Sequence, residues 1–155
     1  MRAKTHLTAI PRKALPVPTR WLLGSGYWYA GQVLDYGCGK CHAVNNEHFD
    51  ADGYDPHFMP NGIPEGKKYA TILCIYVLCT IPSARKRQQI LRHIRSLLIK
   101  DGRAFIAVRA DRPRRGWGFN KRGTYQGKIT DIPGADLIYG CSQYRIFMFS
   151  DKSKI

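Results

Sequence analysis

Hydrophobic residues along the chain gather into short runs separated by polar segments. The continuous apolar run at 69–78, YATILCIYVL, has the length and β-branched residues of a strand buried on both faces. Shorter runs at 33–35 and 103–109 predict two further strands. Another strand is expected to end within 53–56, where proline follows the sequence GYD. Strands that alternate with helical segments indicate an α/β fold with a mostly parallel sheet.

The clearest amphipathic segment predicts a helix that begins near Ser83, a good N-cap residue, and ends at Asp101-Gly102. Its apolar residues recur at helical spacing and form one stripe. The stripe contains Ile90, Leu91, Ile94, Leu97 and Leu98. Near the end of the chain, residues 127–132 (GKITDI) and 144–150 (YRIFMFS) are expected to form a closing antiparallel pair.

Composition divides the chain into a basic N-terminal arm at 1–18 and a single domain at 19–155. The prolines of the arm favour an extended conformation, and a short helix is expected at 18–23. No apolar run approaches the ~20 residues of a membrane helix. The N-terminal residues also lack the apolar segment of a signal peptide. We therefore expect a cytoplasmic protein that does not enter a membrane.

Basic residues strongly outnumber acidic ones. There are 25 Lys and Arg against 11 Asp and Glu, which gives a formal net charge of +14. Such an excess favours an anionic partner, and we favour nucleic acid, either DNA or RNA, over an anionic membrane surface. A solvated basic surface without a dedicated partner is the alternative.

The segment LDYGCGKCH at 34–42 supports two interpretations. Its second half, CGKCH, has the spacing of c-type haem attachment and offers zinc ligands. Covalent haem needs export, however, and no second Cys/His pair follows at zinc-finger spacing. In its first half a strand ends at Asp35, and Gly37 and Gly39 let the backbone turn sharply and approach a ligand. We therefore predict a ligand-binding turn and no metal.

Four segments, VLDYGCGK, GYDP, YATILCIYVLCTIP and LLIKDGRAFIAVR, resemble in order and spacing the class I S-adenosylmethionine-dependent methyltransferases over about residues 30–110. HLTAIPR at 6–12, GYDPHFMP and YVLCTIP also resemble methyltransferases associated with DNA phosphorothioation and their short phage-type relatives. The resemblance implies a minimal Rossmann-like sheet, mostly parallel, with a closing antiparallel strand. Because only residues 56–68 separate the second strand from the run at 69–78, the sheet is expected to be shortened around the third strand.

The same resemblance implies S-adenosyl-L-methionine as cofactor. Asp55 would accept the ribose hydroxyls, its alternative role being that of a turn-forming Asp before proline. Asp35 would orient the glycine turn or reach the cofactor's amino group, or else only cap its strand. The cofactor-binding residues expected in this way are Asp35, Gly37, Cys38, Gly39, Asp55, Pro56 and His57.

The residues after the fourth strand of such enzymes select the substrate. This chain has Ile-Tyr-Val-Leu at 75–78, without the (D/N/S)-P-P-(Y/F) motif of enzymes that methylate exocyclic amines of bases. Tyr76 is the candidate catalytic residue facing the methyl group, and an ordinary core aromatic is the alternative. Cys74 and Cys79 have apolar neighbours, so we expect buried thiols rather than nucleophiles.

The segment at 108–126 combines basic residues with interleaved aromatic rings, as in a groove for single-stranded nucleic acid. A disordered basic loop with its rings in the core is the alternative. His6 and Arg12, in the arm, would fold over the site as the narrower resemblance suggests, or belong to a mobile tail. The substrate-binding candidates are His6, Arg12, Arg109, Arg114, Arg115, Trp117 and Tyr125.

The function expected from the sequence is therefore that of an S-adenosylmethionine-dependent methyltransferase acting on an anionic substrate, with nucleic acid favoured. Two alternatives remain at this point. One is a methyltransferase of the same fold that acts on a small molecule, and the other is a non-catalytic module that binds S-adenosylmethionine or nucleic acid. A homodimer that shares its substrate surface is compatible with so small a domain.

Overall fold

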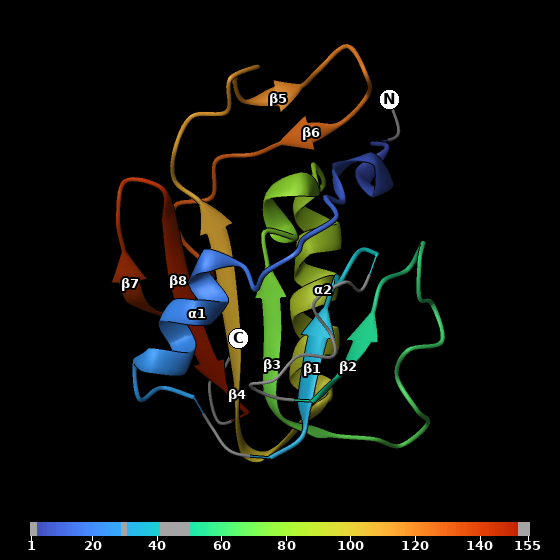
Figure 1. Ribbon diagram of the computed structural model, residues 1–155, viewed down its shortest axis with the longest axis vertical. Helices are drawn as coiled ribbons and strands as arrows, with labels where there is room; N and C mark the ends of the chain where they lie inside the picture. The colour runs from blue at the N-terminus through green and yellow to red at the C-terminus, as the bar shows by residue number, and fades with distance from the viewer. Residues whose placement is uncertain (1–2, 29–30, 41–49, 152–155) are drawn as a thin grey trace.

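A six-stranded sheet in the order β2-β1-β3-β4-β8-β7 organises the computed structural model, which describes residues 3–28, 31–40 and 50–151 (Figure 1). The first four of these strands run parallel, whereas β8 is antiparallel to β4 and to β7. The prediction of a mostly parallel α/β sheet with antiparallel closure is thus confirmed. The strands are β1 (Val33–Tyr36), β2 (Ala51–Tyr54), β3 (Tyr69–Ile75), β4 (Leu98–Arg109), β7 (Asp136–Gly140) and β8 (Tyr144–Ser150).

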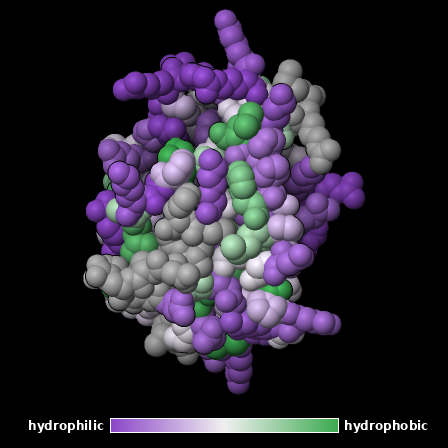
Figure 2. Space-filling view, turned by 45° about the vertical axis from the view of Figure 1, so that its right-hand side comes forward, coloured by the Kyte–Doolittle hydropathy of each residue, from purple (hydrophilic) through white to green (hydrophobic). Residues whose placement is uncertain are grey.

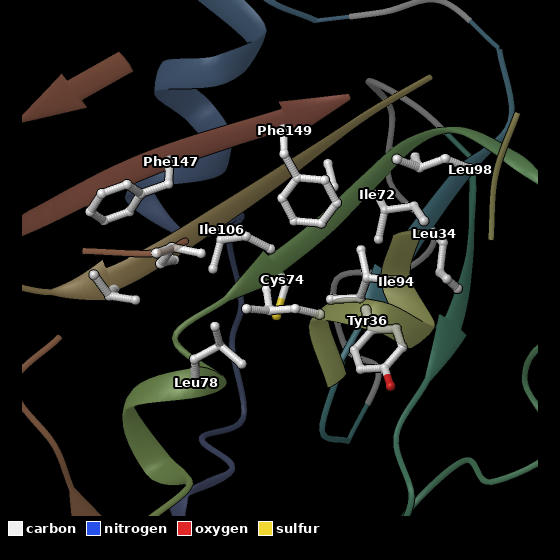
Figure 3. Close-up of a cluster of buried hydrophobic side chains, with 14 of the residues drawn as sticks. Leu34, Tyr36, Ile72, Cys74, Leu78, Ile94, Leu98, Ile106, Phe147 and Phe149 are labelled. Atoms are coloured by element: carbon white, nitrogen blue, oxygen red, sulfur yellow. The ribbon is translucent and has the colours of Figure 1, made fainter. Parts of the chain in front are cut away.

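Among the described residues, one helix covers each face of the sheet. Helix α1 (Val17–Gly24) buries Leu22 against one face, in a cluster with Phe105 and Ile146. Helix α2 (Ala84–Ser96) buries Leu91 and Ile94 against the other face, and Figure 3 shows Ile94 among the side chains of β1, β3, β4 and β8. Two short 3-10 helices, η1 (Thr5–Thr8) and η2 (Leu78–Thr80), lie in the N-terminal arm and after β3.

The sequence pattern explains this placement of strands and helices. β3 lies between β1 and β4 with a helix on each side, and six of its seven residues are buried, as its unbroken apolar run predicts. α2 begins as expected, because the Ser83 side chain accepts a hydrogen bond from the backbone N–H of Lys86. In the described ranges, no helix is long and apolar enough to cross a membrane.

The expected shortening of the sheet is also present. Residues 56–68 contain no helix and no strand beyond an isolated bridge between Asp55 and Met59. β2 is therefore an edge strand, and β3 follows it in the chain after a turn-rich loop. The described part of this connection therefore adds no helix beside the ends of β1 and β2.

The predicted end of the long helix is wrong. α2 stops at Ser96, and Leu98 already pairs with Tyr69 as the first residue of β4. The chain then turns tightly within the strand, where Asp101 has a φ of +63°. A Cβ on Gly102 would lie 3.0 Å from the carbonyl oxygens of Ile99 and Tyr69. The strand pairing of Leu98 thus overrides a helical periodicity that its side chain fits equally well.

The predicted strand at 127–132 is also wrong, because β8 pairs with β7 and β4 instead. Ile129 and Ile132 are buried in the α2-side core, so their apolar alternation reflects packing of an irregular segment. The segment at 108–126 is not disordered in the structure. It contains a two-stranded hairpin of β5 (Gly118–Phe119) and β6 (Tyr125–Gln126), which lies at the carboxyl end of the parallel strands (Figure 1).

Candidate functional site

A cavity of about 1100 Å³ opens at the carboxyl ends of β1, β2 and β3. Ligands bind at this edge in α/β sheets, because the loops that follow parallel strands converge there. The cavity walls come from the arm, the glycine turn after β1, the start of the loop after β2, the segment after β3 and the first half of α2. The cavity therefore joins segments that are far apart in the chain.

The turn after β1 has no room for side chains at Gly37. Gly37 has a φ of +81°, and a Cβ there would lie 2.3 Å from Cγ2 of Val77. The backbone N–H groups of Gly37 and Cys38 both donate to the carbonyl oxygen of Tyr54, at 2.6 and 3.1 Å. Gly39, with a φ of +61°, would place a Cβ 3.2 Å from the Cβ of Ala9. The turn thus packs closely against the residues after β3 and against the arm.

The Asp55 carboxylate connects the two loops that follow β1 and β2. Its Oδ2 accepts the N–H of Gly39 at 3.1 Å, and its Oδ1 accepts those of His57 and Phe58 at 2.8 and 3.0 Å. Asp55 therefore forms the turn that its Asp-Pro sequence indicates. Because each carboxylate oxygen has about two acceptor positions, the bonds formed by the described residues leave Oδ2 capacity for one more donor.

Asp35 and Tyr76 face the cavity beside the arm residue Arg12. Burial raises the pKa of Asp35 to about 7, the Arg12 guanidinium opposes this shift, and the Asp55 carboxylate adds to it. Burial also raises the pKa of Tyr76 to about 12, so its phenol is neutral at physiological pH. The Arg12 guanidinium lies 6.0 Å from the centroid of the Tyr76 ring.

Tyr76 holds a backbone conformation that is rare for an aromatic residue. Its φ is +61°, and its N–H donates to the carbonyl oxygen of Ala107 at 2.9 Å. This turn ends β3 at Ile75, earlier than the apolar run to residue 78 suggested. Positions of this kind are often found at functional sites, where the surrounding structure maintains them. Tyr76 also packs against both apolar clusters of the core, so its catalytic role and its alternative as a core aromatic both stay predictions.

The N-terminal arm lies along the cavity. The His6 imidazole stacks on that of His57, with centroids 4.3 Å apart and planes inclined by 18°. The N–H of Lys4 donates to the carbonyl oxygen of Gly123 in the β5–β6 hairpin at 2.9 Å. His6 and Arg12 both line the cavity, so the structure places these two sequence-predicted residues beside the cofactor candidates.

The remaining substrate candidates lie outside the cavity lining given by the described residues. Arg109 forms two hydrogen bonds with the Asp111 carboxylate, at 2.8 and 2.7 Å, so its guanidinium is already paired. Arg114 and Arg115 are exposed and Trp117 is half-buried. The Tyr125 ring packs against Phe119 at 5.2 Å. These residues form a rim near the cavity, because the N–H of Gly127 anchors the hairpin to the carbonyl oxygen of Cys79.

Sequence reasoning missed one wall of the cavity. We call this surface the α2 wall; it consists of Tyr36, Tyr54, Gln89, Ile90 and His93. The helical residues follow Ser83 and Lys86 at intervals of three or four and form a stripe beside the core stripe, with Ile90 in both. Polar residues at this spacing resemble a solvated helix face, so only the two tyrosines at the strand ends could have indicated the wall.

Two further expectations concern cysteine and metal chemistry. Cys74 and Cys79 are buried, and burial raises the pKa of both thiols, which supports their structural role. Cys41 and His42, from the haem-like pattern, lie outside the described residues. Among the residues that are described, no group of three or more His, Cys, Asp or Glu is placed to hold a metal ion.

A family model described as "Methyltransferase domain" matches residues 16–137. The chain therefore belongs to the methyltransferase domain family. No curated protein matches the chain.

Two solved structures are similar to the chain. The N-methyltransferase NodS from Bradyrhizobium japonicum WM9, in complex with S-adenosyl-l-homocysteine, is 11% identical with a TM-score of 0.51, and the match covers 88% of this chain and 85% of that chain. CalS10 from Micromonospora echinaspora, an amino pentose methyltransferase of calicheamicin biosynthesis with S-adenosylmethionine bound, is 14% identical with a TM-score of 0.41. That match covers 86% of this chain and 60% of CalS10. The similarity to NodS shows a shared Rossmann-like methyltransferase fold.

The packing at Gly37 predicts that Gly37→Ala lowers the free energy of unfolding by about 2–5 kcal/mol. The new Cβ meets Val77 at 2.3 Å, and the positive φ disfavours any residue with a side chain. Gly24→Ala is the matched control, because no atom lies within 4 Å of a Cβ there. Urea unfolding followed by circular dichroism measures both variants. Equal midpoints for Gly37→Ala and the wild type would contradict the packing described.

The pKa of Asp35 predicts a pH-dependent effect of Asp35→Asn. The folded-state pKa is about 7 and the ordinary value is 3.8, so between these values the folded protein keeps a proton that the unfolded chain has released. The contribution of Asp35 to stability is therefore full below about pH 4 and is lost as the pH rises through 7. Asp35→Asn should accordingly gain stability over the wild type on going from pH 5 to pH 8. Urea unfolding at both pH values measures this gain.

Asp136→Asn, at an exposed position of β7, is the control for Asp35→Asn. Its difference from the wild type should change little between pH 5 and pH 8. An Asp35→Asn profile parallel to that of the wild type would show that Asp35 is ionised throughout this range in the folded protein.

Proposed function

We propose that this protein is an S-adenosylmethionine-dependent methyltransferase that acts on an anionic substrate, specifically a nucleic acid. The observation that carries the proposal is the composition of the large cavity at the carboxyl ends of the strands. It brings the glycine turn, the Asp55 carboxylate and the Tyr76 phenol together beneath a basic arm. The chain's membership of the methyltransferase domain family and its NodS-like fold support the same activity.

The residues present fit the cofactor. Ligand cavities usually measure about 300–1,000 Å³, so a cavity of about 1100 Å³ has room for the cofactor and part of a substrate. Gly37 and Gly39 keep side chains away from the turn. With respect to the described residues, Asp55 Oδ2 has acceptor capacity for a ribose hydroxyl. NodS, which shares the fold, is described in complex with S-adenosyl-l-homocysteine, and this supports the same cofactor class here.

When bound, S-adenosylmethionine would supply a methyl group already activated on a cationic sulfur. The chain's residues then need mainly to position the nucleophile and exclude water. The Asp55 carboxylate lines the cavity, and a bound cation would favour the ionised form of the neighbouring Asp35. The neutral phenol of Tyr76 can donate a hydrogen bond to a substrate atom. The arm, through His6 and Arg12, covers this part of the cavity.

The charge distribution around the cavity supports an anionic substrate. Four cationic side chains line it, against the carboxylates of Asp35 and Asp55; they are Lys4, Arg12, Lys40 and Lys86. The rim adds the exposed Arg114 and Arg115. The upper end of the molecule, where Figure 1 shows the arm and the β5–β6 hairpin, is hydrophilic in Figure 2. Cations for phosphates beside the Phe119–Tyr125 ring pair suit a single-stranded nucleic acid.

The narrower resemblance extends the proposal. The likeness of HLTAIPR to methyltransferases associated with DNA phosphorothioation, and to their short phage-type relatives, makes DNA the first substrate to test and RNA the second. A cytoplasmic location and a homodimer that shares its substrate surface remain predictions from the sequence.

Cofactor binding is the first prediction of this proposal. We expect saturable binding of S-adenosylmethionine in isothermal titration calorimetry and a loss of at least tenfold in affinity for Asp55→Ala, about 1.4 kcal/mol. The variant loses both the ribose acceptor and the anchor of Gly39. Asp136→Asn, on the exposed edge strand, is the control and should bind as the wild type does.

The titration and a labelled-methyl transfer assay have four informative outcomes. Binding followed by transfer of a labelled methyl group to DNA or RNA supports the full proposal. Binding without transfer to any substrate class favours a non-catalytic module, and transfer only to small molecules favours the other alternative. Absence of binding by the folded wild type would remove the methyltransferase proposal altogether.

Salt dependence tests the nucleic-acid part of the proposal. Each lost phosphate contact should lower the slope of log K against log salt by about 0.7–0.9. We expect the double variant Arg114→Gln/Arg115→Gln to lower the slope for single-stranded DNA by about one to two units. The charge-matched control is Lys68→Gln/Lys100→Gln, because these lysines lie near the amino ends of β3 and β4. Fluorescence anisotropy measures the slopes, and equal losses in both double variants would contradict a specific basic rim.

A further inference from the structure

The solvent-facing side of α2 has a charge pattern that takes no part in the large cavity. We call this surface the outer face of α2; it consists of Arg85, Gln88 and Arg92. All three residues are exposed, and their spacing places them on the side of the helix opposite the buried Ile94. None of the three is among the described residues that line the cavity. The outer face is therefore distinct from the α2 wall.

The charges of α2 are unfavourable for the helix by itself. The helix contains no acidic residue, and its first turn has Arg85, Lys86 and Arg87 at the positive end of the helix dipole. The Arg87 guanidinium donates to two backbone carbonyl oxygens, at 2.6 and 3.1 Å, and Lys86 lines the cavity. No ion pair between described residues includes Arg85 or Arg92. An anion against the outer face would offset this excess of positive charge.

The outer face differs from the rim because it has no aromatic side chain. At the rim, Phe119 is exposed and its ring packs against that of Tyr125 beside the arginines. Rings suit unpaired bases, whose flat faces are free for stacking. In a duplex the bases stack on one another and the phosphates lie outside, so cations without rings suit paired nucleic acid. The two surfaces thus match different parts of a nucleic acid.

The cations of the outer face are held at a fixed spacing. Arg92 follows Arg85 by seven residues, so their Cα atoms lie about 10.5 Å apart along the helix axis. The helix is packed on the sheet and capped by Ser83, which maintains this spacing. Gln88 lies between the two arginines and adds an amide that can donate to phosphate or sugar oxygens. A rigid row of donors suits the regular backbone of a duplex.

The rim and the outer face are adjacent. The N–H of Gly127 donates to the carbonyl oxygen of Cys79 at 2.7 Å, which anchors the β5–β6 hairpin close to the start of α2 (Figure 1). The exposed Lys128 follows in the chain and lines a groove of about 260 Å³, whose other wall includes Gln88. Asp131 is the acidic residue among those described as lining this groove. A mainly cationic surface therefore continues from the rim to the outer face.

We propose that the outer face of α2 binds the phosphates of a paired segment of the nucleic-acid substrate, next to the unpaired segment at the rim. The substrate class is then a nucleic acid in which a duplex adjoins unpaired nucleotides, such as a duplex with an overhang. The inference rests on the proposed function for the kind of substrate, but it concerns binding and does not require methyl transfer.

The test is the double variant Arg85→Gln/Arg92→Gln. The probes are blunt duplex DNA, single-stranded DNA of one of its strands, and the same duplex with a single-stranded overhang. Fluorescence anisotropy at several salt concentrations gives the slope of log K against log salt. We expect the variant to lower the slope by about one to two units for both duplex probes and to leave the single-stranded probe unchanged. Arg114→Gln/Arg115→Gln should show the reverse pattern for blunt duplex and single strand.

Arg20→Gln is the matched control for each single variant, Arg85→Gln and Arg92→Gln. Arg20 is also an exposed arginine of a helix, but α1 covers the opposite face of the sheet. Arg20→Gln should keep the duplex slope of the wild type. The midpoint of urea unfolding of Arg85→Gln should be no lower than that of the wild type, because the variant removes a cation from the positive end of the dipole. A loss of duplex affinity without a loss of stability excludes a merely structural role for Arg85.

Three results would overturn the inference. They are a wild-type duplex slope in Arg85→Gln/Arg92→Gln, equal losses with duplex and single strand, and failure of the wild type to bind duplex DNA. In the last case, binding of poly-L-glutamate that the double variant loses would indicate an acidic protein as the partner instead.

The binding measurements separate this inference from the proposed function. Duplex binding that depends on Arg85 and Arg92, without methyl transfer to any substrate, would support the outer face and contradict the methyltransferase proposal. Methyl transfer to single-stranded DNA with an unchanged duplex slope in Arg85→Gln/Arg92→Gln would support the proposed function and contradict the role of the outer face.

Discussion

The close approach of Gly37 to Val77 is the constraint on which the cavity depends. One residue without a side chain allows the turn after β1 to pass against the segment after β3, while its N–H bonds to the Tyr54 carbonyl at the end of β2. Three strand ends are thereby fixed at one point of the sheet edge. Asp55 continues the arrangement, because its carboxylate joins the N–H of Gly39 to the turn after β2. Backbone groups thus organise the site, and their hydrogen bonds hold the two loops in place without a ligand.

The shortened connection between β2 and β3 changes what this fold can bind. A helix there would cover the α2 side of the β1 and β2 ends. In its absence Tyr36 and Tyr54 cover their own strand ends, and α2 supplies a second, polar stripe beside its core stripe. A small domain has few residues to spare for substrate selection. Here Tyr36, Tyr54 and the second stripe of α2 stand where such a helix would lie, and the same residues line the cavity.

The sequence was sufficient to predict those parts of the structure in which a residue pattern is compatible with one conformation. The unbroken apolar run of β3, the Ser83 cap and the glycine turn each have a single satisfactory conformation. Leu98 and Ile129 show where this fails: both are apolar at spacings that suit two structures, and only long-range pairing or packing decides between them. The α2 wall was missed for a related reason. Gln89 and His93 have the spacing of a solvated helix face, and only the fold brings them to Tyr36 and Tyr54.

The N-terminal arm contacts three segments of the molecule that lie far apart in the sequence. Lys4 joins it to the β5–β6 hairpin, His6 to the loop after β2, and Arg12 to Tyr76. These contacts are one backbone hydrogen bond, one ring stack and one cation–π contact at 6.0 Å, each weak by itself and made by partly or fully exposed residues. The arm therefore contacts both the hairpin and the cavity wall. Because Arg12 also opposes the raised pKa of Asp35, displacement of its guanidinium would favour the protonated carboxyl. A cationic ligand would favour the opposite form, so the charge of Asp35 depends on the position of the Arg12 guanidinium and on what lies in the cavity.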